Sequence, residues 1–434
     1  MGYRALFALV CTALAALCAV TVPGSASADP GLPSVGGNFL WGVSSSGFQS
    51  EGSAPDSNWS RYAGSGRADA YRDSVDFFHR YGEDIQHAAD IGVGVYRISV
   101  EWARVQPSPG DWDFSFYDSV IARIRAAGMR PMITLDHWVF PGWEVDRGGW
   151  RNPGMVNDWL TNARAVVDRY AGSDPLWVTF NEPLAYVGQE QRIGDISALD
   201  VAPMIDRMVT AHRGIYDYIH SRQSDAMVTS NIAYSDIGAA QADASFVDRI
   251  ADKLDYVGID YYYGGSLSNP PNLAAMLTNQ PSSLVLEPEG IYYVLRRYAQ
   301  KFPGRPLYIV ENGMPSDNGS PTTDGMTRAD DLRDTVYWVQ RAKADGMNVM
   351  GYNYWSITDN YEWGSYSPRF GLYTVDVTTD PGLTRHPTDA VGAYHDIATS
   401  GGVPAGYLPT RAPALCSLQD LPSSCIAPVT VPGR

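Results

Sequence analysis

The sequence predicts an α/β fold, a single-domain (β/α)8 TIM barrel, from three observations. Short β-prone runs alternate with longer segments of helical period, a pattern that favours βα units and a parallel sheet. There are eight such runs, and eight βα units close into a barrel that leaves no sheet edge unpaired. The stretch Trp41-Gly42-Val43-Ser44 at the first run offers no Gly-rich phosphate turn, which the alternative, a doubly wound open sheet, would usually carry there.

Each predicted element follows from this alternation. The strands are apolar runs at Phe39–Val43, Val95–Ser99, Pro131–Leu135, Leu176–Phe180, Met227–Asn231, Tyr256–Ile259, Leu307–Val310 and Val349–Trp355. Amphipathic segments between and after them predict helices, among them Ser74–Asp90, Met155–Tyr170, Pro203–Ser221, Asp330–Asp345 and Thr388–Ala398. No internal repeat or low-complexity segment interrupts this order, so one domain is expected.

The first 28 residues have the composition of a leader. Arg4 is followed by a continuous apolar stretch that closes on Ala26-Ser27-Ala28, which is typical of a secretory signal peptide and its cleavage site. We therefore expect residues 1–28 to be removed and the protein to be secreted. An uncleaved anchor is the alternative, although the apolar run is short for a membrane span. The barrel would then occupy residues 29–400, and a Pro-rich tail residues 401–434.

The charge, the cysteines and the histidines of the chain indicate which binding partners, disulfides and cofactors to expect. The formal net charge is −16 and no basic cluster interrupts it, so neither nucleic acid nor a membrane surface is expected as a partner. Cys11 and Cys18 fall in the leader, which leaves Cys416 and Cys425 in the tail. In a secreted protein such a pair favours a local disulfide. The seven histidines show no metal-binding spacing, so no metal ion and no other cofactor is predicted.

Polar and aromatic side chains follow six of the predicted strands. In a barrel these carboxyl ends meet at one mouth, where such barrels carry their chemistry. In strand order they are Arg97, His137, Trp138, Asn181, Glu182, Asp260, Tyr262, Glu311, Asn312, Trp355, Glu362 and Trp363. The mixture suits a sugar, because pyranose faces stack on indoles and each hydroxyl needs a hydrogen-bonding partner. It does not suit a phosphate, which requires Lys, Arg or a glycine nest.

Two glutamates, Glu182 and Glu311, stand across this mouth. Two carboxyl groups break a glycosidic bond when one stays protonated for the leaving oxygen and the other is ionised to attack the anomeric carbon or activate water. Arg97 is placed to keep one of them ionised. A single glutamate after a strand is more often a loop residue or a helix N-terminal charge. The six strand ends together favour a catalytic role.

Six stretches carry a family resemblance: FLWGVSSSGFQSEG (39–52), YRISVEWARVQP (96–107), HWVFPGWEVDRGGW (137–150), WVTFNEP (177–183), YIVENG (308–313) and WSITDNYEWGSYSPRFGLYTVD (355–376). In them the chain resembles glycoside hydrolase family 1, the β-glucosidase family. The resemblance implies a (β/α)8 catalytic domain and a retaining double displacement through a glycosyl-enzyme intermediate. Glu182 would be the acid/base and Glu311 the nucleophile. Retention places the two carboxyl groups about 5–5.5 Å apart.

The resemblance also implies supporting roles. Arg97 and Tyr262 would hydrogen-bond the nucleophile, and Asn181 would contact the sugar 2-hydroxyl. The sugar pocket would be lined by Gln49, His137, Trp138, Trp355, Glu362 and Trp363. Most of these have a simpler alternative: a polar turn for Gln49, a hydrogen-bonded strand-end histidine for His137, a loop cap for Glu362, and packing in the core for Trp355 and Trp363.

The chain departs from the family pattern at several places. Asp260 stands where the family usually has Asn, which could raise a neighbouring pKa or alter contacts with the leaving group. The segments after Pro183 and before Tyr256 are short, so a more open cleft is expected. Pro368 and Phe370 replace the Lys and Tyr of phosphoglycoside-selective members, which favours an unphosphorylated sugar.

The function predicted is a secreted retaining β-glycosidase, similar to β-glucosidases, that acts on small β-glycosides or oligosaccharides at the non-reducing end. β-Galactosides, β-fucosides and disaccharide glycosides remain alternative substrates, and transglycosylation an alternative reaction at the same site. A non-catalytic carbohydrate-binding barrel would lack one carboxylate, but both are present. The motifs around Gln49 and Trp355–Trp363 count against an endo-acting glucanase or mannanase. No feature of the sequence predicts an oligomeric state.

Overall fold

The computed structural model describes residues 31–431, except 236–237, 273–274, 276–279 and 323–324. The predicted signal peptide, with Cys11 and Cys18, lies outside the described residues, and so its cleavage stays a prediction. Within the described ranges, no helix combines the length and the apolar character that crossing a bilayer would need.

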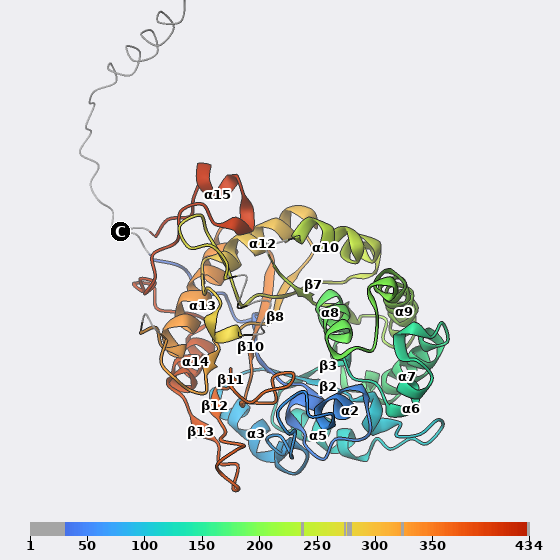
Figure 1. Ribbon diagram of the computed structural model, residues 1–434. Helices are drawn as coiled ribbons and strands as arrows, with labels where there is room; N and C mark the ends of the chain where they lie inside the picture. The colour runs from blue at the N-terminus through green and yellow to red at the C-terminus, as the bar shows by residue number, and fades with distance from the viewer. Residues whose placement is uncertain (1–30, 236–237, 273–274, 276–279, 323–324, 432–434) are drawn as a thin grey trace, which may run out of the picture.

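A parallel sheet curls around the centre of the molecule, inside a ring of helices (Figure 1). Its strands are β1 (Leu40–Ser44), β2 (Val95–Ser99), β3 (Arg130–Asp136), β4 (Leu176–Phe180), β5 (Met227–Thr229), β6 (Ile232–Ala233), β7 (Val257–Asp260), β8 (Leu307–Glu311) and β10 (Val349–Trp355). Their order in the sheet is β5-β4-β3-β2-β1-β10-β8-β7-β6. Each of the eight predicted strands is therefore present.

The fifth predicted strand, Met227–Asn231, is divided in two. β5 pairs with β4 and β6 pairs with β7, so one short stretch of chain joins both ends of the sheet and closes the barrel. Ser230 and Asn231 form the break. The Ser230 hydroxyl donates to the Phe180 carbonyl at 2.9 Å, and the Asn231 amide donates inside the barrel. These side-chain bonds compete with a regular strand pairing, which is why the prediction of one unbroken strand was wrong.

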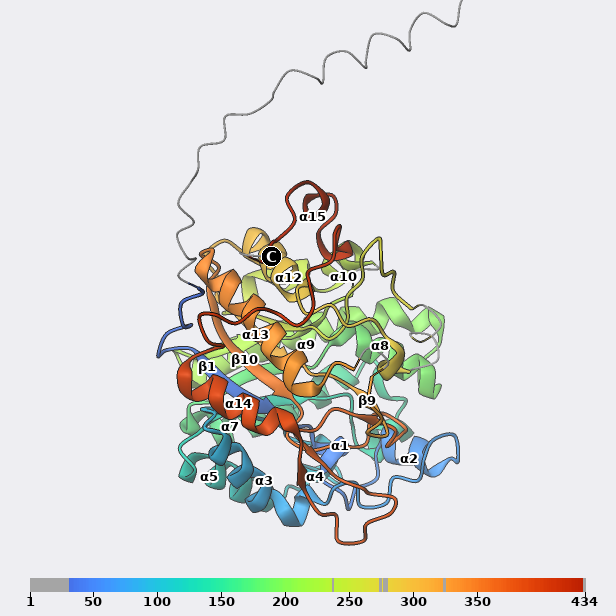
Figure 2. The same cartoon turned by 90° about the vertical axis from the view of Figure 1, so that its left-hand side faces the viewer.

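Helices cover the outside of the sheet (Figures 1 and 2). The longer ones are α3 (Phe77–Ile91), α5 (Ser115–Ala126), α7 (Met155–Tyr170), α8 (Pro183–Ile193), α9 (Val201–Arg222), α12 (Gly290–Lys301), α13 (Arg328–Ala344) and α14 (Asp389–Ser400). Shorter pieces are α1 (Gly47–Ser50), α2 (Asn58–Gly64), α4 (Trp102–Val105), α6 (Gly142–Asp146), α10 (Ala239–Ser245), α15 (Ser423–Ile426), and the strands β9 (Ser316–Asp317), β11 (Pro368–Arg369), β12 (Tyr373–Thr374) and β13 (His386–Pro387).

Local chemistry sets the ends of these helices. A capping box starts α13, because the Thr327 side chain accepts from the Asp330 N–H and the Asp330 carboxylate accepts from the Thr327 N–H. α3 begins three residues later than the predicted Ser74, because Ser74 and Asp76 have φ angles of 46° and 56°. This left-handed backbone cannot continue a right-handed helix.

The barrel interior changes from apolar to polar along the strands. Seven buried residues form its apolar layers: Val95, Met132, Leu176, Val178, Tyr256, Tyr308 and Val310. On β2, Val95 belongs to this cluster, and Arg97 follows two positions later. Side chains two apart on a strand share a face, so the guanidinium of Arg97 enters the interior just above the apolar layer. This is the end of the barrel where the predicted site lies.

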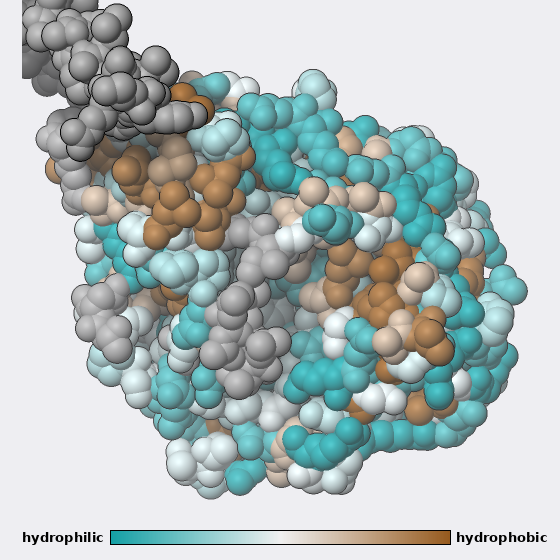
Figure 3. All heavy atoms as spheres, turned by 45° about the horizontal axis from the view of Figure 1, so that its top comes forward, coloured by the Kyte–Doolittle hydropathy of each residue, from teal (hydrophilic) through white to brown (hydrophobic). Residues whose placement is uncertain are grey.

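The tail after α14 packs against the barrel. Asp334 on α13 accepts hydrogen bonds from the Tyr407 hydroxyl at 2.6 Å and the Thr410 N–H at 2.7 Å, and a disulfide joins Cys416 to Cys425. Several large apolar side chains of the tail remain exposed, namely Leu408, Leu415, Leu421 and Ile426. Figure 3 shows apolar atoms gathered on the side where α15 lies in Figure 1. The predicted domain limit at residue 400 stays a prediction.

Candidate active site

A pocket of about 390 Å³ opens at the carboxyl ends of the strands. Its lining includes ten of the eleven residues to which the family resemblance assigns a role: Gln49, His137, Trp138, Asn181, Glu182, Tyr262, Glu311, Trp355, Glu362 and Trp363. Asp260 and Asn312, which were also predicted at this mouth, do not line it. The eleventh residue with an assigned role, Arg97, is fully buried beneath the pocket floor. The structure therefore brings together residues that the sequence separates by up to 314 positions.

Glu311, the last residue of β8, is held from two sides. One guanidinium nitrogen of Arg97 forms an ion pair with its Oε1, and the Tyr262 hydroxyl donates to its Oε2 at 2.8 Å. Glu311 is 4% exposed, so water screens this ion pair little. Charge-assisted bonds of this kind stabilise the ionised carboxylate, and they fix its orientation below the pocket.

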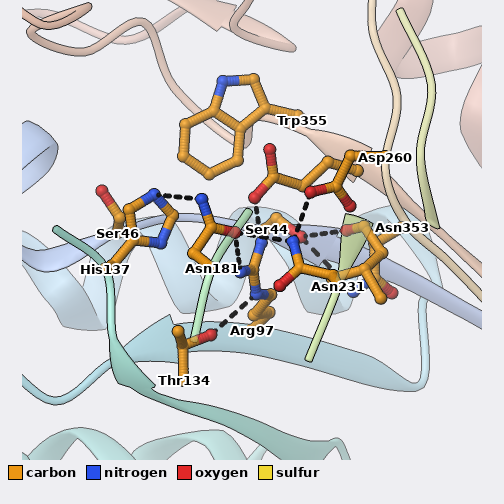
Figure 4. Close-up of polar contacts among 12 residues, drawn as sticks. Ser44, Ser46, Arg97, Thr134, His137, Asn181, Asn231, Asp260, Asn353 and Trp355 are labelled. Carbon is orange, nitrogen blue, oxygen red and sulfur yellow. Dashed lines mark hydrogen bonds and ion pairs between the residues drawn. The ribbon is translucent and has the colours of Figure 1, made fainter. Parts of the chain in front are cut away.

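The other two guanidinium nitrogens of Arg97 are hydrogen-bonded as well (Figure 4). Its Nη2 donates to Asn181 Oδ1 at 2.7 Å, and its Nε donates to Thr134 Oγ1 at 2.9 Å. Asn181 Oδ1 accepts a second bond, from Asn231 Nδ2 at 2.7 Å. Because its carbonyl oxygen is bound twice, the Asn181 amide is held with its nitrogen side toward His137 Nε2, 3.3 Å away. A fixed amide donor at the pocket floor suits a sugar hydroxyl.

Glu182 occupies the residue before α8 and has a left-handed backbone, with φ 42° and ψ 64°. Pro183 is the first helical residue, and its fixed φ suits that position. A left-handed conformation costs a residue with a Cβ atom about 1–2 kcal/mol. Trp138 and Trp363 share this feature, with φ angles of 72° and 47°. Strained backbone of this kind clusters at functional sites, where the surrounding structure maintains it.

The pKa of Glu182 is raised to about 8. Burial is the main cause and the negative charge of Glu311 adds to it, while Arg97 and a hydrogen bond to Asp260 act in the opposite direction. Glu182 is thus a protonated acid at neutral pH, beside a carboxylate that is ion-paired. Two carboxyl groups whose environments separate them in this way can serve as a general acid and a nucleophile.

Asp260 is the third carboxyl group at this point. It ends β7 and pairs in register with Glu311 on β8, after a shift between Ile259 and Asp260. One carboxyl oxygen from each of Glu182, Asp260 and Glu311 lies within 4.8 Å of the others. The Arg97 guanidinium already supplies a positive charge inside this group, so the arrangement fits an ion pair better than a metal ion. The absence of a metal stays a prediction.

Glu362 lies on the opposite wall and joins two predicted sugar contacts. Trp355 Nε1 donates to its Oε1 and Gln49 Nε2 to its Oε2, each at 3.1 Å. The Gln49 carbonyl is held in turn by the Ser46 hydroxyl at 2.6 Å. Burial raises the pKa of Glu362 to about 7, while the bond from Trp355 lowers it. A carboxyl group fixed between two donors at the pocket wall suits a sugar with adjacent hydroxyls.

Aromatic rings form the rest of the wall. The His137 ring stacks on the Trp355 and Trp363 rings with centroid distances of 5.9 and 5.8 Å. Trp138 packs on Trp363 with a centroid distance of 4.4 Å, and its indole nitrogen donates to the backbone carbonyl of Asn181 at 2.8 Å. Burial and the nearby Arg97 charge hold the pKa of His137 well below its usual range. His137 is therefore neutral, and its Nδ1 has no bond to any described residue.

The sequence analysis missed two residues of the network: Thr134, which accepts a hydrogen bond from Arg97, and Asn231. The Nδ2 of Asn231 donates both to Asn181 and to Asp260, so it connects the fourth and sixth predicted strands. Asn231 ends the fifth predicted strand, and extending the strand-end analysis to that strand would have found it. Its role also depends on the break between β5 and β6, which no sequence pattern indicated.

A larger hollow of about 700 Å³ lies beside the pocket and shares Leu284 with it. Arg411, Ala412 and Ala414 of the tail form part of its wall. None of the predicted site residues lines it. The chemistry therefore belongs to the smaller pocket, and the hollow extends the space next to its mouth.

Comparisons with known proteins agree with this geometry. The chain matches the family model Glycosyl hydrolase family 1 over residues 33–215 and 214–403. It is 30% identical over 375 residues to the galactolipid galactosyltransferase SFR2 of Arabidopsis thaliana and 28% identical over 394 residues to the beta-glucosidase-like SFR2 of Oryza sativa. These matches cover 76% and 80% of this chain, but only 59% of either plant protein.

A bacterial relative matches over almost its whole length. The 1,4-beta-D-glucan glucohydrolase of Thermotoga neapolitana is 26% identical over 439 residues, covering 84% of this chain and 98% of that protein. Among solved structures, the beta-glucosidase of Thermotoga maritima in complex with castanospermine superposes with a TM-score of 0.74. Its identity is 23%, and the match covers 86% of this chain and 99% of that one. The (β/α)8 prediction is confirmed, and the chain belongs to glycosyl hydrolase family 1.

Proposed function

We propose that this protein is a retaining β-glycosidase of β-glucosidase type, with Glu311 as nucleophile and Glu182 as acid/base. The observation that carries the proposal is the closeness of the two carboxyl groups, because one oxygen of Glu182 lies within 4.8 Å of one oxygen of Glu311. Retaining enzymes have carboxyl groups about 5–5.5 Å apart, whereas inverting enzymes need about 6.5–9.5 Å to admit a water. The shorter separation supports direct attack by one carboxylate.

Two steps follow from this arrangement. In the first, Glu311 attacks the anomeric carbon while Glu182 gives its proton to the leaving oxygen, and a glycosyl ester forms on Glu311. In the second, Glu182 takes a proton from water, which displaces the sugar from Glu311 with net retention. The bonds from Arg97 and Tyr262 to Glu311 orient it for attack.

The pocket chemistry supports an unphosphorylated sugar. No Lys or Arg occurs among the described residues that line it, and Pro368 and Phe370 lie at its edge. A phosphate group would therefore find no cation there. The Thermotoga relatives are named a glucan glucohydrolase and a beta-glucosidase, which supports a β-glucoside as first choice, with β-galactosides, β-fucosides and disaccharide glycosides as alternatives.

Transfer to an acceptor other than water is the second candidate reaction. Apart from the predicted site residues, the pocket lining is mostly apolar, with Ala185, Ala233, Pro281, Leu284 and Phe370 beside the polar Gln189 and Gln280. Such a wall favours an apolar alcohol or aglycone over bulk water. The Arabidopsis relative is named a galactosyltransferase, in keeping with this reaction. Measuring how the glycosyl-enzyme partitions between water and added alcohols would separate the two reactions.

Secretion is part of the proposal. The Cys416–Cys425 disulfide favours an oxidising compartment, in agreement with the leader predicted at residues 1–28. Expression in a host that secretes proteins, followed by N-terminal sequencing of the product in the medium, tests it. A mature N-terminus at Asp29 is expected, and an intact leader on cell-associated protein would contradict it.

The experiment that tests the reaction is proton NMR of the first sugar released from a panel of aryl β-glycosides. A β-anomer that appears first and then equilibrates with the α-anomer is the expected result. First release of the α-anomer would exclude retention. Absence of hydrolysis across the panel, with folded protein, would exclude a glycosidase for those sugars. The panel of glucoside, galactoside and fucoside identifies the preferred sugar by its kcat/KM.

A further inference from the structure

Asp260 is a buried acid that the two-glutamate mechanism does not use. Its side chain is 1% exposed at the end of β7. The Asn231 amide donates to its Oδ2, whereas its Oδ1 accepts no hydrogen bond from any donor in the described part of the chain. Figure 4 shows Asp260 above Asn231 and close to the Arg97 network. A buried carboxylate oxygen without a donor is costly, so its environment must provide a proton.

The groups around Asp260 leave it without a cation. Glu311 on β8 and Glu182 before α8 face it as acids, and Tyr262 follows it in the chain. Glu362, beyond β10, acts on Glu182 from the far wall. Arg97 on β2 is the nearby cation, but it is bound to Glu311, Asn181 and Thr134. The three carboxyl groups of Glu182, Asp260 and Glu311 thus lie near one positive charge, that of Arg97. Because Arg97 is ion-paired with Glu311, Asp260 is left without a cation of its own.

We propose that Asp260 and Glu182 hold one proton between them, as a hydrogen-bonded carboxylic acid–carboxylate pair. This inference rests on the proposed function, because it makes Asp260 a positioning residue for the acid/base of that reaction. One oxygen of Asp260 lies within 4.8 Å of one oxygen of Glu182, and two ionised carboxylates so close repel each other, so one of them retains a proton. The unpartnered Oδ1 of Asp260 then receives the donor that it lacks.

The acidities of the two groups agree with this pairing. Burial raises the pKa of Asp260 well above its ordinary value, and the charges of Glu311 and Glu182 raise it further. The pKa of Glu182 is raised as well, mainly by burial and by the charge of Glu311, while its interaction with Asp260 lowers it. Both shifts have the same direction, so the pair retains protons at neutral pH. Interacting acids of this kind lose their protons in two steps that belong to the pair.

The shared proton keeps the charge of the site constant during the reaction. Before the first step, Glu311 carries one negative charge and the Glu182–Asp260 pair carries another. As Glu311 forms its bond to the anomeric carbon, the bond to the leaving oxygen breaks and the proton of the pair moves to that oxygen. Glu311 becomes a neutral ester and both members of the pair are ionised, so two negative charges remain throughout.

The same arrangement prepares the second step. With Asp260 ionised beside it, Glu182 is a stronger base, because a nearby like charge favours the protonated form. Water gives its proton to Glu182, its oxygen binds the anomeric carbon, and the ester bond to Glu311 breaks. The pair again holds one proton. An asparagine at position 260 can donate a hydrogen bond to Glu182 but adds no negative charge.

The test is the pH dependence of kcat/KM for the best aryl glycoside of the panel, measured for wild type and Asp260→Asn. The amide has the same shape and can donate to Glu182, so a purely structural role would leave the profile in place. In Asp260→Asn, the alkaline limb of the profile should shift to lower pH by about one unit or more. At a fixed pH on that limb, kcat/KM should therefore fall about tenfold. An unchanged or raised limb would overturn the proposal.

Glu101→Gln is the matched control. Glu101 is also a buried acid whose pKa burial raises to about 8, next to another carboxyl group, Glu51. It hydrogen-bonds Ser99 and does not line the pocket. Its replacement should leave the alkaline limb of activity where it is. A similar shift in both variants would show a general effect of removing a buried charge and would contradict the pairing.

An infrared titration without substrate separates this inference from the proposed function. The band of a protonated carboxyl group is followed with rising pH in wild type, Asp260→Asn and Glu182→Gln. If the pair shares a proton, wild type keeps its last protonated carboxyl group in the site to a higher pH than either variant. If the band of the protonated carboxyl group disappears at the same pH in all three proteins, the shared proton is excluded, whatever their activity. A wild type that shows the pair but hydrolyses no glycoside would refute the proposed function alone.

Discussion

Arg97 on β2 and Glu311 on β8 form a buried ion pair although they lie 214 positions apart in the sequence. The barrel brings them together, because their strands point into the same interior. The guanidinium also holds Asn181 and Thr134, so one side chain organises the pocket floor. The orientation of the proposed nucleophile thus depends on the packing of the whole barrel.

Replacing Arg97 should affect both stability and activity. Arg97→Met leaves the Glu311 carboxylate buried without its cation, which typically costs about 3–5 kcal/mol of unfolding free energy. Urea unfolding measures this, and kcat should fall by at least about a hundredfold because Glu311 loses its fixed orientation. Arg130→Met is the control: its ion pair with Asp174 is partly exposed, so about 1 kcal/mol or less is expected. Equal losses for the two variants would argue against a special role for Arg97.

Glu182→Gln should impair poor leaving groups more than good ones. An alkyl leaving oxygen needs a proton in the transition state, whereas a nitrophenolate leaves without one, so kcat/KM should fall by about 10²–10⁴-fold more for the alkyl glycoside. In wild type, activity should fall as the pH rises through about 8, the pKa of Glu182, because the acid form is then lost. Equal sensitivity of both substrates would indicate that Glu182 is not the acid.

Gln49→Ala should weaken binding of one part of the sugar. Gln49 donates to Glu362, and both are placed to share adjacent hydroxyls. Loss of a hydrogen bond that involves a charged group costs about 1.5–3 kcal/mol, or roughly 10–150-fold in kcat/KM. Monodeoxy substrates provide the check: the substrate that lacks the bound hydroxyl should lose little further activity in the variant. Additive losses for every deoxy substrate would place Gln49 outside the sugar contacts.

Stability should decline from acid toward neutral pH. Burial raises the pKa values of Glu101 to about 8 and of Asp136 to about 7, above their values in the unfolded chain. Between the pKa of each acid in the unfolded chain and its higher pKa in the folded protein, the folded state binds more protons than the unfolded state. Each such acid therefore stabilises the protein at low pH, and this contribution is lost as the pH rises. Each contributes about 1.4 kcal/mol per pH unit. In urea unfolding between pH 5 and pH 7, Glu101→Gln should reduce the slope by about that amount.

The fold was predictable because its signal is periodic. Eight apolar runs between helical segments fix the strand order of a barrel, and the carboxyl ends of strands then indicate the mouth. Asp76 and Ser230 show the limit of this reasoning. A left-handed backbone before α3 and a side-chain bond that interrupts the fifth strand depend on local conformations that hydrophobic patterning does not encode.

Much of the pocket lining could be read from the sequence. Strand ends and motifs indicated ten of the residues that line the pocket, and the family resemblance implies their roles, which stay predictions. Other lining residues, such as Gln189 and Tyr263, were not singled out. Asn231 was missed because its contacts arise across three strands. The departure at Asp260 was visible in the sequence. Its unpartnered oxygen and its closeness to both glutamates are properties of the three-dimensional arrangement alone.

Chemical rescue of Glu311→Gly by azide tests the central claim most directly. Removing the carboxylate opens space on the face of the sugar from which Glu311 would attack, and azide should enter there. The variant should be inactive without azide, and with azide it should convert an aryl β-glycoside with a good leaving group into the α-glycosyl azide, identified by NMR. Full activity of Glu311→Gly without azide, or formation of the β-glycosyl azide, would contradict Glu311 as the nucleophile of a retaining reaction.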